Sequence, residues 1–360
     1  MNNEIVPVEL DYRDLVETYG SPLLVLDQAA VRKQYRALVK ALPGVRMHYA
    51  LKPLPHSAVV ATLKAEGCCF DLATNGEVDL MLENQINPDD CIHTHPIKRD
   101  GDIRYALEYG CKVFVFDNPI ELEKFIPYQD KAQLLLRVSF PNPESKVDLS
   151  KKFGCTPEAT LPLLRKAKEL GLNVIGLSFH VGSQVPNSRR HVEAITACNQ
   201  LIRDAAAENI NLQVLDIGGG FPVNYGADGA DLDIYEFCAP IREALSNTPE
   251  GIRLLAEPGR FISAPCMTSV SSVMGKAERF GRMWYYLDDG LYGSYSGQLF
   301  DHINYPKSAP YATGEALPAV LAGPTCDSID VLADDIDLPA LNVGDVIIGK
   351  MMGAYTWASA

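Results

Sequence analysis

Short apolar runs alternate with helical stretches along most of the chain. The runs have the length and the β-branched or aromatic content of buried strands. We predict eight of them as one series, at Val45–Leu51, Cys68–Leu72, Cys91–Thr94, Lys112–Phe116, Gln133–Val138, Val174–Phe179, Leu212–Ile217 and Arg253–Ala256. Around and between them apolar residues recur at helical spacing, which predicts helices that include Ala29–Leu42, Ala58–Glu66, Gly76–Glu83, Ile120–Phe125, Pro157–Leu170, His191–Ala207 and Tyr235–Leu245.

Eight strands that alternate with helices predict a closed (β/α)8 barrel, which is an α/β fold. The alternative is an open doubly wound sheet, which would gather its functional residues near one switch point. Here polar or glycine residues stand at the ends of all the runs, at Lys52, Asp71, His95, Asp117, Arg137, His180, Gly218 to Gly220 and Glu257. This distribution favours the barrel, because a barrel has its active site at the carboxyl ends of its strands.

The pattern changes after about residue 262, where helical periodicity fades and Gly, Pro and Asn separate short apolar segments. We predict strands in this region at Met267–Val273, Met283–Leu287, Ala319–Leu321 and Asp345–Ile348. The predicted domains are a barrel over residues 26–262 and a C-terminal β-rich domain over residues 263–360. The N-terminal segment, residues 1–25, is expected to join the β domain, because the barrel pattern begins only after it.

Composition narrows the class of protein. With 360 residues, of which 47% are hydrophobic and 22% charged, the chain can bury a large core and form two domains. A net charge of −14 argues against nucleic acid as a partner. Nine cysteines without a Cys-x-x-Cys pair fit reduced thiols in a cytoplasmic protein. We expect neither a signal peptide nor a membrane span.

Lys52 stands at the end of the first predicted barrel strand, which Pro53 and Pro55 stop. Because side chains alternate along a strand, His48, Ala50 and Lys52 are expected to share one face. A desolvated lysine favours its neutral amine and can form a Schiff base with a carbonyl cofactor. The alternative is a surface lysine at the end of a strand.

Three later segments carry residues that suit an aromatic, anionic cofactor. His180 can stack on a planar ring and Ser183 can bind phosphate, although a buried structural histidine fits the pattern equally well. The run Gly218 to Gly220 lets backbone N–H groups close on an anion, or forms only a tight turn. Glu257 can hold a pyridine nitrogen in its protonated form and Arg260 can bind phosphate, unless they form a surface ion pair.

Two further segments lie in the predicted β domain. Cys326 is interpreted as an acid or a nucleophile, because cysteine is uncommon in an exposed polar turn. Tyr355 can bring a phenol to a phosphate group. In the barrel, His93 and His95 suggest a metal site, but no set of Cys, His or acidic residues completes it, so we predict no metal.

These segments, in this order, resemble the ornithine decarboxylase group of fold-type III pyridoxal-phosphate enzymes, which includes ornithine, lysine and diaminopimelate decarboxylases. The resemblance rests on Lys52, His-Val-Gly-Ser-Gln, the triple glycine, Glu-Pro-Gly-Arg, Cys-Asp-x-x-Asp and Gly-Ala-Tyr-Thr, over about residues 20–357. It implies an alanine-racemase-like barrel joined to a β domain, with pyridoxal 5′-phosphate as cofactor. The implied catalytic residues are Lys52, Cys326, Glu257 and His180. The implied cofactor-binding residues are Lys52, Asp71, Glu77, Arg137, His180, Ser183, Gly218, Gly219, Gly220, Glu257, Gly259, Arg260 and Tyr355.

The resemblance also implies how a substrate is bound. Asp301 and Asp327 would bind its distal ammonium group next to Phe300, which stands where the group frequently has a tyrosine. Cys326 would protonate the α-carbon from the other subunit of a homodimer with shared active sites. Lys152 and Asp330 match an ion pair between subunits in this group. The lysine motif reads Ala-Leu-Lys-Pro, whereas Ala-Val-Lys is usual.

We therefore predict a pyridoxal-phosphate-dependent decarboxylase of a basic L-amino acid, most simply ornithine, which would give putrescine for polyamine biosynthesis. A lysine decarboxylase, or an enzyme that accepts both substrates, is the main alternative. Diaminopimelate is less favoured, because its distal carboxylate would meet Asp301 and Asp327. A racemase would usually present arginine in place of Glu257, and a non-catalytic regulatory homologue would have lost cofactor contacts.

Overall fold

The computed structural model describes residues 10–141, 150–226 and 232–359. Contacts divide these residues into two units. The barrel unit comprises residues 27–141, 150–224 and 232–266, and the β unit comprises residues 10–26, 225–226 and 267–359. We propose that these units are the two domains of the protein. The prediction for the N-terminal segment falls partly on residues 1–9, which lie outside the described residues.

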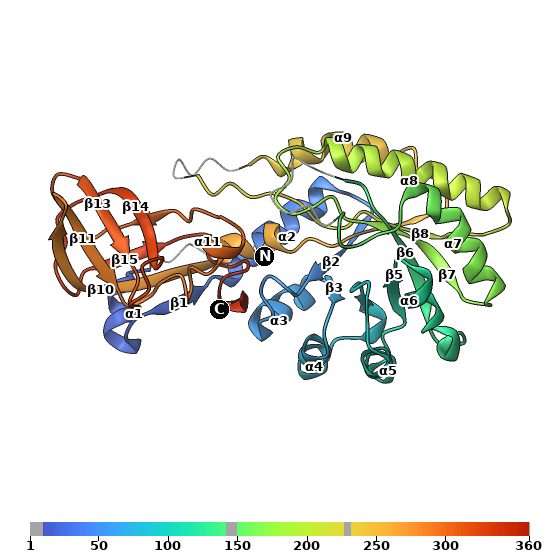
Figure 1. Cartoon of the computed structure of the whole chain (residues 1–360), viewed down its shortest axis with the longest axis horizontal. Coiled ribbons are helices and arrows are strands. Elements are labelled where there is room, and N and C mark those ends of the chain that lie inside the picture. Colours follow the sequence, from blue (N-terminus) through green and yellow to red (C-terminus); the bar gives the residue numbers. More distant parts are fainter. Residues whose placement is uncertain (1–9, 142–149, 227–231, 360) are drawn as a thin grey trace, which may run out of the picture. The chain divides into compact units, whose positions relative to one another are not determined.

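The barrel unit contains a closed barrel of parallel strands with helices around it (Figure 1). Its strands are β2 (Val45–Ala50), β3 (Cys69–Leu72), β4 (Cys91–His93), β5 (Val113–Phe116), β6 (Gln133–Val138), β7 (Val174–Phe179), β8 (Val214–Asp216) and β9 (Arg253–Ala256). Its helices are α2 (Gln28–Ala41), α3 (Ser57–Ala65), α4 (Asn75–Glu83), α5 (Asp100–Tyr109), α6 (Pro119–Glu123), α7 (Pro157–Glu169), α8 (Arg189–Ala207), α9 (Ile234–Leu245) and α10 (Arg260–Ser263). The predicted (β/α)8 barrel is confirmed, and β9 pairs with β2 to close it.

Local sequence explains where many of these elements begin and end. α7 starts as predicted, with the Thr156 side chain accepting from the backbone N–H of Ala159 and a proline in the first turn. Our predicted helices omit α5, whose first turn contains Gly101, a residue that weakens a helical pattern. β2 ends at Ala50, so Lys52 lies in the turn after the strand, not in the strand itself.

The β unit is built on a seven-stranded sheet with the order β12-β15-β10-β11-β13-β14, and β1 pairs with β10 beside this path. The strands are β1 (Leu23–Leu26), β10 (Met267–Arg279), β11 (Arg282–Leu287), β12 (Lys307–Ser308), β13 (Leu317–Ala322), β14 (Val331–Leu338) and β15 (Val346–Gly349). Two helices, α1 (Tyr12–Tyr19) and α11 (Gly297–Phe300), complete the unit. The sequence pattern does not predict β14, because this edge strand exposes acidic residues that break an apolar run.

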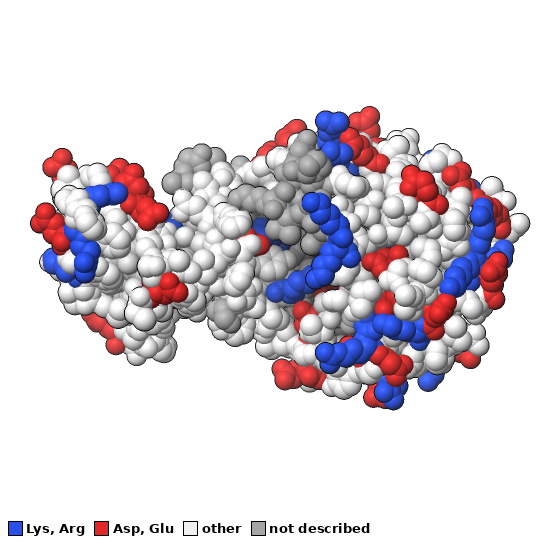
Figure 2. All heavy atoms as spheres, in the orientation of Figure 1, with Lys and Arg blue, Asp and Glu red and all other residues white. Residues whose placement is uncertain are grey.

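Each unit has an apolar core of its own. Inside the barrel unit, neighbouring strands contribute one residue each to a buried cluster made of Val115, Leu135, Ile175, Val214 and Leu255. In the β unit, Val270, Val346 and Ile348 form a second buried cluster. Acidic and basic side chains are interspersed on the faces shown in Figure 2. Among the described residues, no helix is both long enough and apolar enough to cross a membrane.

Candidate active site

Lys52 lies at the carboxyl end of β2, and the residues just before it are bonded to β3 and to the segment that follows β9. The backbone N–H of Ala50 donates to the carbonyl of Pro258 at 3.1 Å, and that of Leu51 donates to Asp71 at 3.3 Å. A Cβ on Gly259 would approach Cγ of Pro53 to 2.7 Å, so the glycine allows the two loops to meet. The side chain of Lys52 is exposed in this chain, which differs from the desolvated lysine that we expected. The reason is its position in the turn after the strand.

Three carboxyl groups from distant parts of the sequence gather at this end of the barrel. Burial, followed by the charge of Glu257, raises the pKa of Asp71 well above its usual value. Burial and the neighbouring Asp216 raise the pKa of Glu257 in the same way. Burial also raises the pKa of Asp216, whose Oδ1 accepts from the backbone N–H of Gly218 at 2.9 Å. Buried carboxyl groups that face one another cannot all ionise without cations nearby.

Arg137 and Lys52 supply positive charge to this carboxyl cluster, defined as Asp71, Asp216 and Glu257. The charges on both side chains lower the pKa of Glu257, although burial outweighs them. Burial lowers the pKa of Arg137 itself, while the charge of Glu257 opposes that shift. The cluster therefore has the chemistry to pair with a further buried cation, such as a protonated ring nitrogen.

His180 follows β7 and has a defined proton arrangement. Its Nδ1 accepts from the backbone N–H of Gly182 at 3.0 Å, so the neutral ring carries its proton on Nε2. Burial and the charges of Arg137 and Lys52 hold the pKa of His180 well below its usual value. A neutral imidazole can lie against a pyridinium ring without repelling it. The position of His180 thus fits the predicted stacking partner.

The triple glycine lies where backbone carbonyl groups of other segments leave no room for a side chain. A Cβ on Gly218 would lie 2.1 Å from the carbonyl oxygen of Phe179, and one on Gly220 would lie 2.6 Å from that of Gly182. A Cβ on Gly219 would approach the carbonyl oxygen of Glu257 to 2.7 Å. Glycine is therefore required at all three positions because other backbone segments pack against them, and no Cβ shields the N–H groups of this turn from an anion.

Arg260 and Ser183 come together in the same unit. The guanidinium of buried Arg260 donates to Oγ of Ser183 from Nε at 3.3 Å and from Nη2 at 3.2 Å. An arginine and a hydroxyl next to a glycine cradle suit the oxygens of a phosphate group. The residues present in the barrel unit therefore fit pyridoxal phosphate, with an anion site at the glycines and carboxyl groups near Lys52.

Two predicted pocket residues have structural roles that the sequence did not reveal. Glu77 is part of a capping box with Thr74 at the start of α4, and its Oε2 accepts from the backbone N–H groups of Ala73 at 2.5 Å and Thr74 at 3.1 Å. Asp71 accepts from the hydroxyl of Thr94 at 2.5 Å, which links β3 to the end of β4. Sequence reasoning also missed Asp216 as a site residue, although its position before the triple glycine was a usable signal.

The remaining predicted site residues belong to the β unit. Cys326 is exposed, whereas the other eight cysteines are buried. Asp327 is also exposed and accepts from the hydroxyl of Tyr292 at 2.5 Å. That hydrogen bond lowers the pKa of Asp327, so its carboxylate stays ionised. Phe300 is 64% exposed at the end of α11, and Asp301 follows it as the C-cap residue.

Asp330 organises the loop that carries Cys326. Its carboxylate is buried and accepts from the backbone N–H of Leu291 at 2.8 Å and from the N–H and hydroxyl of Thr325 at 3.1 and 2.7 Å. These bonds explain the position of Asp330 within its own chain. The pairing with Lys152 stays a prediction. Tyr355 has a left-handed backbone, with φ of 56°, in the segment after β15.

Comparison with known proteins identifies the class and then the family. The pyridoxal-binding domain of pyridoxal-dependent decarboxylases matches residues 28–264. The structure resembles that of a lysine/ornithine decarboxylase from Vibrio vulnificus complexed with putrescine, with a TM-score of 0.92 and 55% identity over 97% of this chain and 93% of that one. The chain is 33% identical to a lysine/ornithine decarboxylase of Selenomonas ruminantium, over 98% of this chain and 89% of that protein. It is 34% identical to an ornithine decarboxylase of Rattus norvegicus, over 93% and 77% of the two chains.

The closed barrel and these matches therefore place the chain among the fold-type III pyridoxal-phosphate enzymes. Within that class, this chain belongs to the family of pyridoxal-dependent decarboxylases. The predicted family, enzyme class and cofactor are thereby confirmed.

Proposed function

We propose that this enzyme decarboxylates a basic L-amino acid and prefers L-ornithine, which gives putrescine. The observation that carries the proposal is the ionised carboxylate of Asp327 on an exposed loop of the β unit, held by Tyr292. Such a carboxylate can bind the distal ammonium of a diamino acid. The relatives named lysine/ornithine and ornithine decarboxylase support this substrate class and keep lysine as the alternative.

The proposed cofactor contacts divide into three groups. Lys52 would hold the cofactor covalently and His180 would lie against its ring, with Asp71, Glu77 and Arg137 supporting the pocket. Glu257 would keep the ring nitrogen protonated, because a carboxylate favours the charged form of a neighbouring base. The phosphate would be bound by Ser183, Gly218, Gly219, Gly220, Gly259, Arg260 and Tyr355. When bound, pyridoxal phosphate supplies an electron sink for the electron pair that carbon dioxide leaves behind.

The residues of this chain would do the rest of the chemistry. Asp301 and Asp327 would orient the substrate by its distal ammonium, next to Phe300. Cys326 would then deliver a proton to the α-carbon. We propose that Cys326 and Asp327 act on the barrel of a second subunit, in a homodimer with shared sites. A cytoplasmic location fits the eight buried free thiols, because reduced cysteines persist in that compartment.

Substrate preference is tested by kcat/KM for ornithine, lysine, arginine and diaminopimelate, with product analysis. One methylene in a pocket is worth about 1–3 kcal/mol, so we expect ornithine to lead lysine by about 10–200-fold. Arginine should follow far behind because its guanidinium needs a larger, planar slot, and diaminopimelate because its distal carboxylate would meet two carboxylates of the same charge. Lysine ahead of ornithine would reverse the proposed preference. Diaminopimelate ahead of both would remove the assignment of Asp301 and Asp327.

Shared sites are tested by mixing two inactive variants, Lys52→Ala and Cys326→Ala. If each site takes its lysine from one subunit and its cysteine from the other, a mixed dimer carries one intact site. We expect activity to return to about a quarter of the wild-type level after random exchange of subunits, since half of the dimers are mixed. No recovery after demonstrated exchange would place both residues of a site in one chain.

A further inference from the structure

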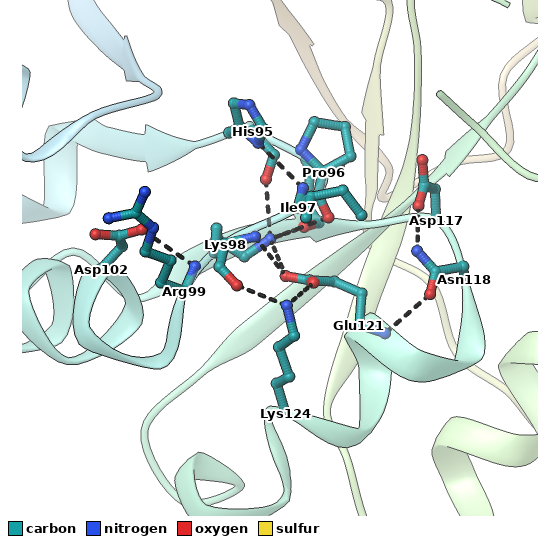
Figure 3. A network of polar contacts seen from close by, with 11 residues as sticks. His95, Pro96, Ile97, Lys98, Arg99, Asp102, Asp117, Asn118, Glu121 and Lys124 are labelled. Atoms are coloured by element: carbon teal, nitrogen blue, oxygen red, sulfur yellow. Dashed lines mark hydrogen bonds and ion pairs between the residues drawn. The ribbon is translucent and has the colours of Figure 1, made fainter. Parts of the chain in front are cut away.

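A buried ion pair lies outside the barrel strands and contributes no side chain to the site described above. Lys98, between β4 and α5, contacts Glu121 of α6 with 2.9 Å between Nζ and Oε1, and both side chains are 1% exposed (Figure 3). Removing two charges from water costs several kcal/mol each, so such a pair persists only where further hydrogen bonds satisfy it. The partners of each group show which parts of the chain the pair holds.

Lys98 fastens the segment after β4 to the neighbouring strand. Its ammonium donates to the carbonyl of His95 at 2.9 Å and to that of Val115, in β5, at 2.6 Å. Glu121 accepts the backbone N–H of Lys98 at 3.1 Å, and its other oxygen pairs with Lys124 at 2.6 Å. The position of His95 at the end of β4 therefore depends on Lys98 and Glu121.

The same network reaches a second segment through the start of α6. The side chain of Asn118 caps α6 by accepting the backbone N–H of Glu121 at 2.9 Å, and it donates to Oδ1 of Asp117 at 2.8 Å. Oδ2 of Asp117 accepts the backbone N–H of Gly154 at 2.8 Å. Phe153, the residue before Gly154, is thereby tied to the same ion pair.

The two segments meet at the ring of Phe153. The His95 ring contacts it edge-on, with 5.8 Å between ring centroids and 76° between planes. The guanidinium of Arg137 lies over the Phe153 ring at 5.4 Å. Arg137 in turn faces Asp71, Asp117, Asp216 and Glu257, which come from four different strands or strand ends.

We propose that Lys98 and Glu121 are positioning residues of the active site, which place Arg137 against the carboxyl cluster through His95 and Phe153. The inference rests on the proposed role of Glu257 toward the cofactor. The physical reason is that the guanidinium of Arg137 lies over the Phe153 ring. It can oppose the charge of the buried carboxyl groups only while that ring holds it in place. Without that support Arg137 gains freedom, and Glu257 loses part of its opposing charge.

His95 contacts the Phe153 ring as a neutral side chain and brings no charge to this arrangement. Its Nδ1 accepts the backbone N–H of Ile97 at 3.1 Å. Burial, together with the charges of Lys98, Lys52 and Lys152, lowers the pKa of His95. A neutral His95 ring adds no positive charge beside Phe153, whose ring already has two cations over it, Arg137 at 5.4 Å and Lys152 at 5.0 Å from the centroid. The charged groups that face Glu257 are Asp71, Asp216, Arg137 and Lys52.

The test compares the pH dependence of the visible absorbance of the bound cofactor in purified holoenzymes. The first variant is the double change Lys98→Met with Glu121→Leu, which replaces a buried pair by apolar residues and often preserves stability. The second is Phe153→Leu, which changes a partly buried residue. The control is Lys166→Met, which breaks the exposed pair between Lys166 and Glu123 of α6. Thermal unfolding of every variant is measured alongside.

In both test variants the acidic limb of the absorbance profile should shift to higher pH by about half a pH unit or more. This corresponds to about a threefold change in the proton dissociation constant. The direction follows because weaker opposition by Arg137 raises the pKa of the carboxyl groups. The control should keep the wild-type profile. If the double variant fails to fold, Phe153→Leu decides. A lower Tm with an unshifted profile would show a structural role only and overturn the proposal. A wild-type protein without the absorbance band would overturn the proposed cofactor contacts as well.

Discussion

The two units use carboxyl groups in opposite ways. In the barrel unit, Asp71, Asp216 and Glu257 are gathered together, and burial raises the pKa of each of them. In the β unit, Asp327 is exposed and the hydroxyl of Tyr292 lowers its pKa. In the first arrangement, buried carboxyl groups surround the two cations Arg137 and Lys52. In the second, a single carboxylate is ionised and exposed to solvent.

This difference shows that the surroundings, not the residue type, set the chemistry of a carboxyl group. The cluster in the barrel suits a permanent cationic partner such as a protonated cofactor ring, because its carboxyl groups need opposing charge. The exposed Asp327 suits a transient partner such as a substrate ammonium. Water solvates its charge when no partner is bound, so the carboxylate does not need a permanent cation. The cysteines also differ in their surroundings, because Cys326 is exposed and Cys198 is buried.

The strongest test of the barrel half of this comparison is Lys52→Ala. We expect loss of the visible absorbance of the bound cofactor and of nearly all turnover, because the side chain that would hold the cofactor is removed. Absorbance spectra of the purified variant, before and after added pyridoxal phosphate, provide the measurement. Lys64→Ala in α3 is the control and should match wild type. An unchanged spectrum in Lys52→Ala would show that Lys52 does not hold the cofactor.

Glu257→Gln asks whether the raised pKa of the barrel carboxyl group matters for chemistry. We expect the cofactor to stay bound while kcat falls by roughly 100-fold or more, because a neutral amide stabilises a ring cation less than a carboxylate does. Stopped-flow or steady-state rates with ornithine, beside the absorbance spectrum, give the answer. If the rate and the spectrum both stay near those of wild type, Glu257 has a structural role.

Asp327→Ala probes the exposed carboxylate of the β unit and should have the smallest effect of the three. A hydrogen bond to a charged group is worth about 1.5–3 kcal/mol, so kcat/KM for ornithine should fall by about 10–100-fold. Cofactor absorbance should be unaffected, in contrast to Lys52→Ala. Tyr292→Phe removes only the hydroxyl and should cost less than Asp327→Ala. If kcat/KM fell equally for ornithine and for an amino acid without a distal ammonium, Asp327 would not determine substrate choice.

Several features could be predicted from the sequence because they are local. The alternation of apolar runs and helices gave all eight barrel strands to within two residues at either end, since strand and helix periodicities differ. The positions of Lys52, His180 and the triple glycine after these runs followed once the barrel was assumed, because all strand ends of a parallel barrel point the same way. The order of the motifs was also sufficient to indicate the family.

The tertiary structure alone decided what depends on neighbours far along the chain. Asp71, Asp216 and Glu257 become one cluster only when β3, β8 and β9 close into a barrel, and their raised pKa values come from shared burial. The ion pair of Lys98 and Glu121 looks like two surface charges in the sequence, and its burial emerges only from packing. Periodicity is a property of successive residues, whereas desolvation and the attraction between charges depend on distances in space. For that reason the sequence determined the barrel and the candidate lysine, and the folded chain determined which charges act on them.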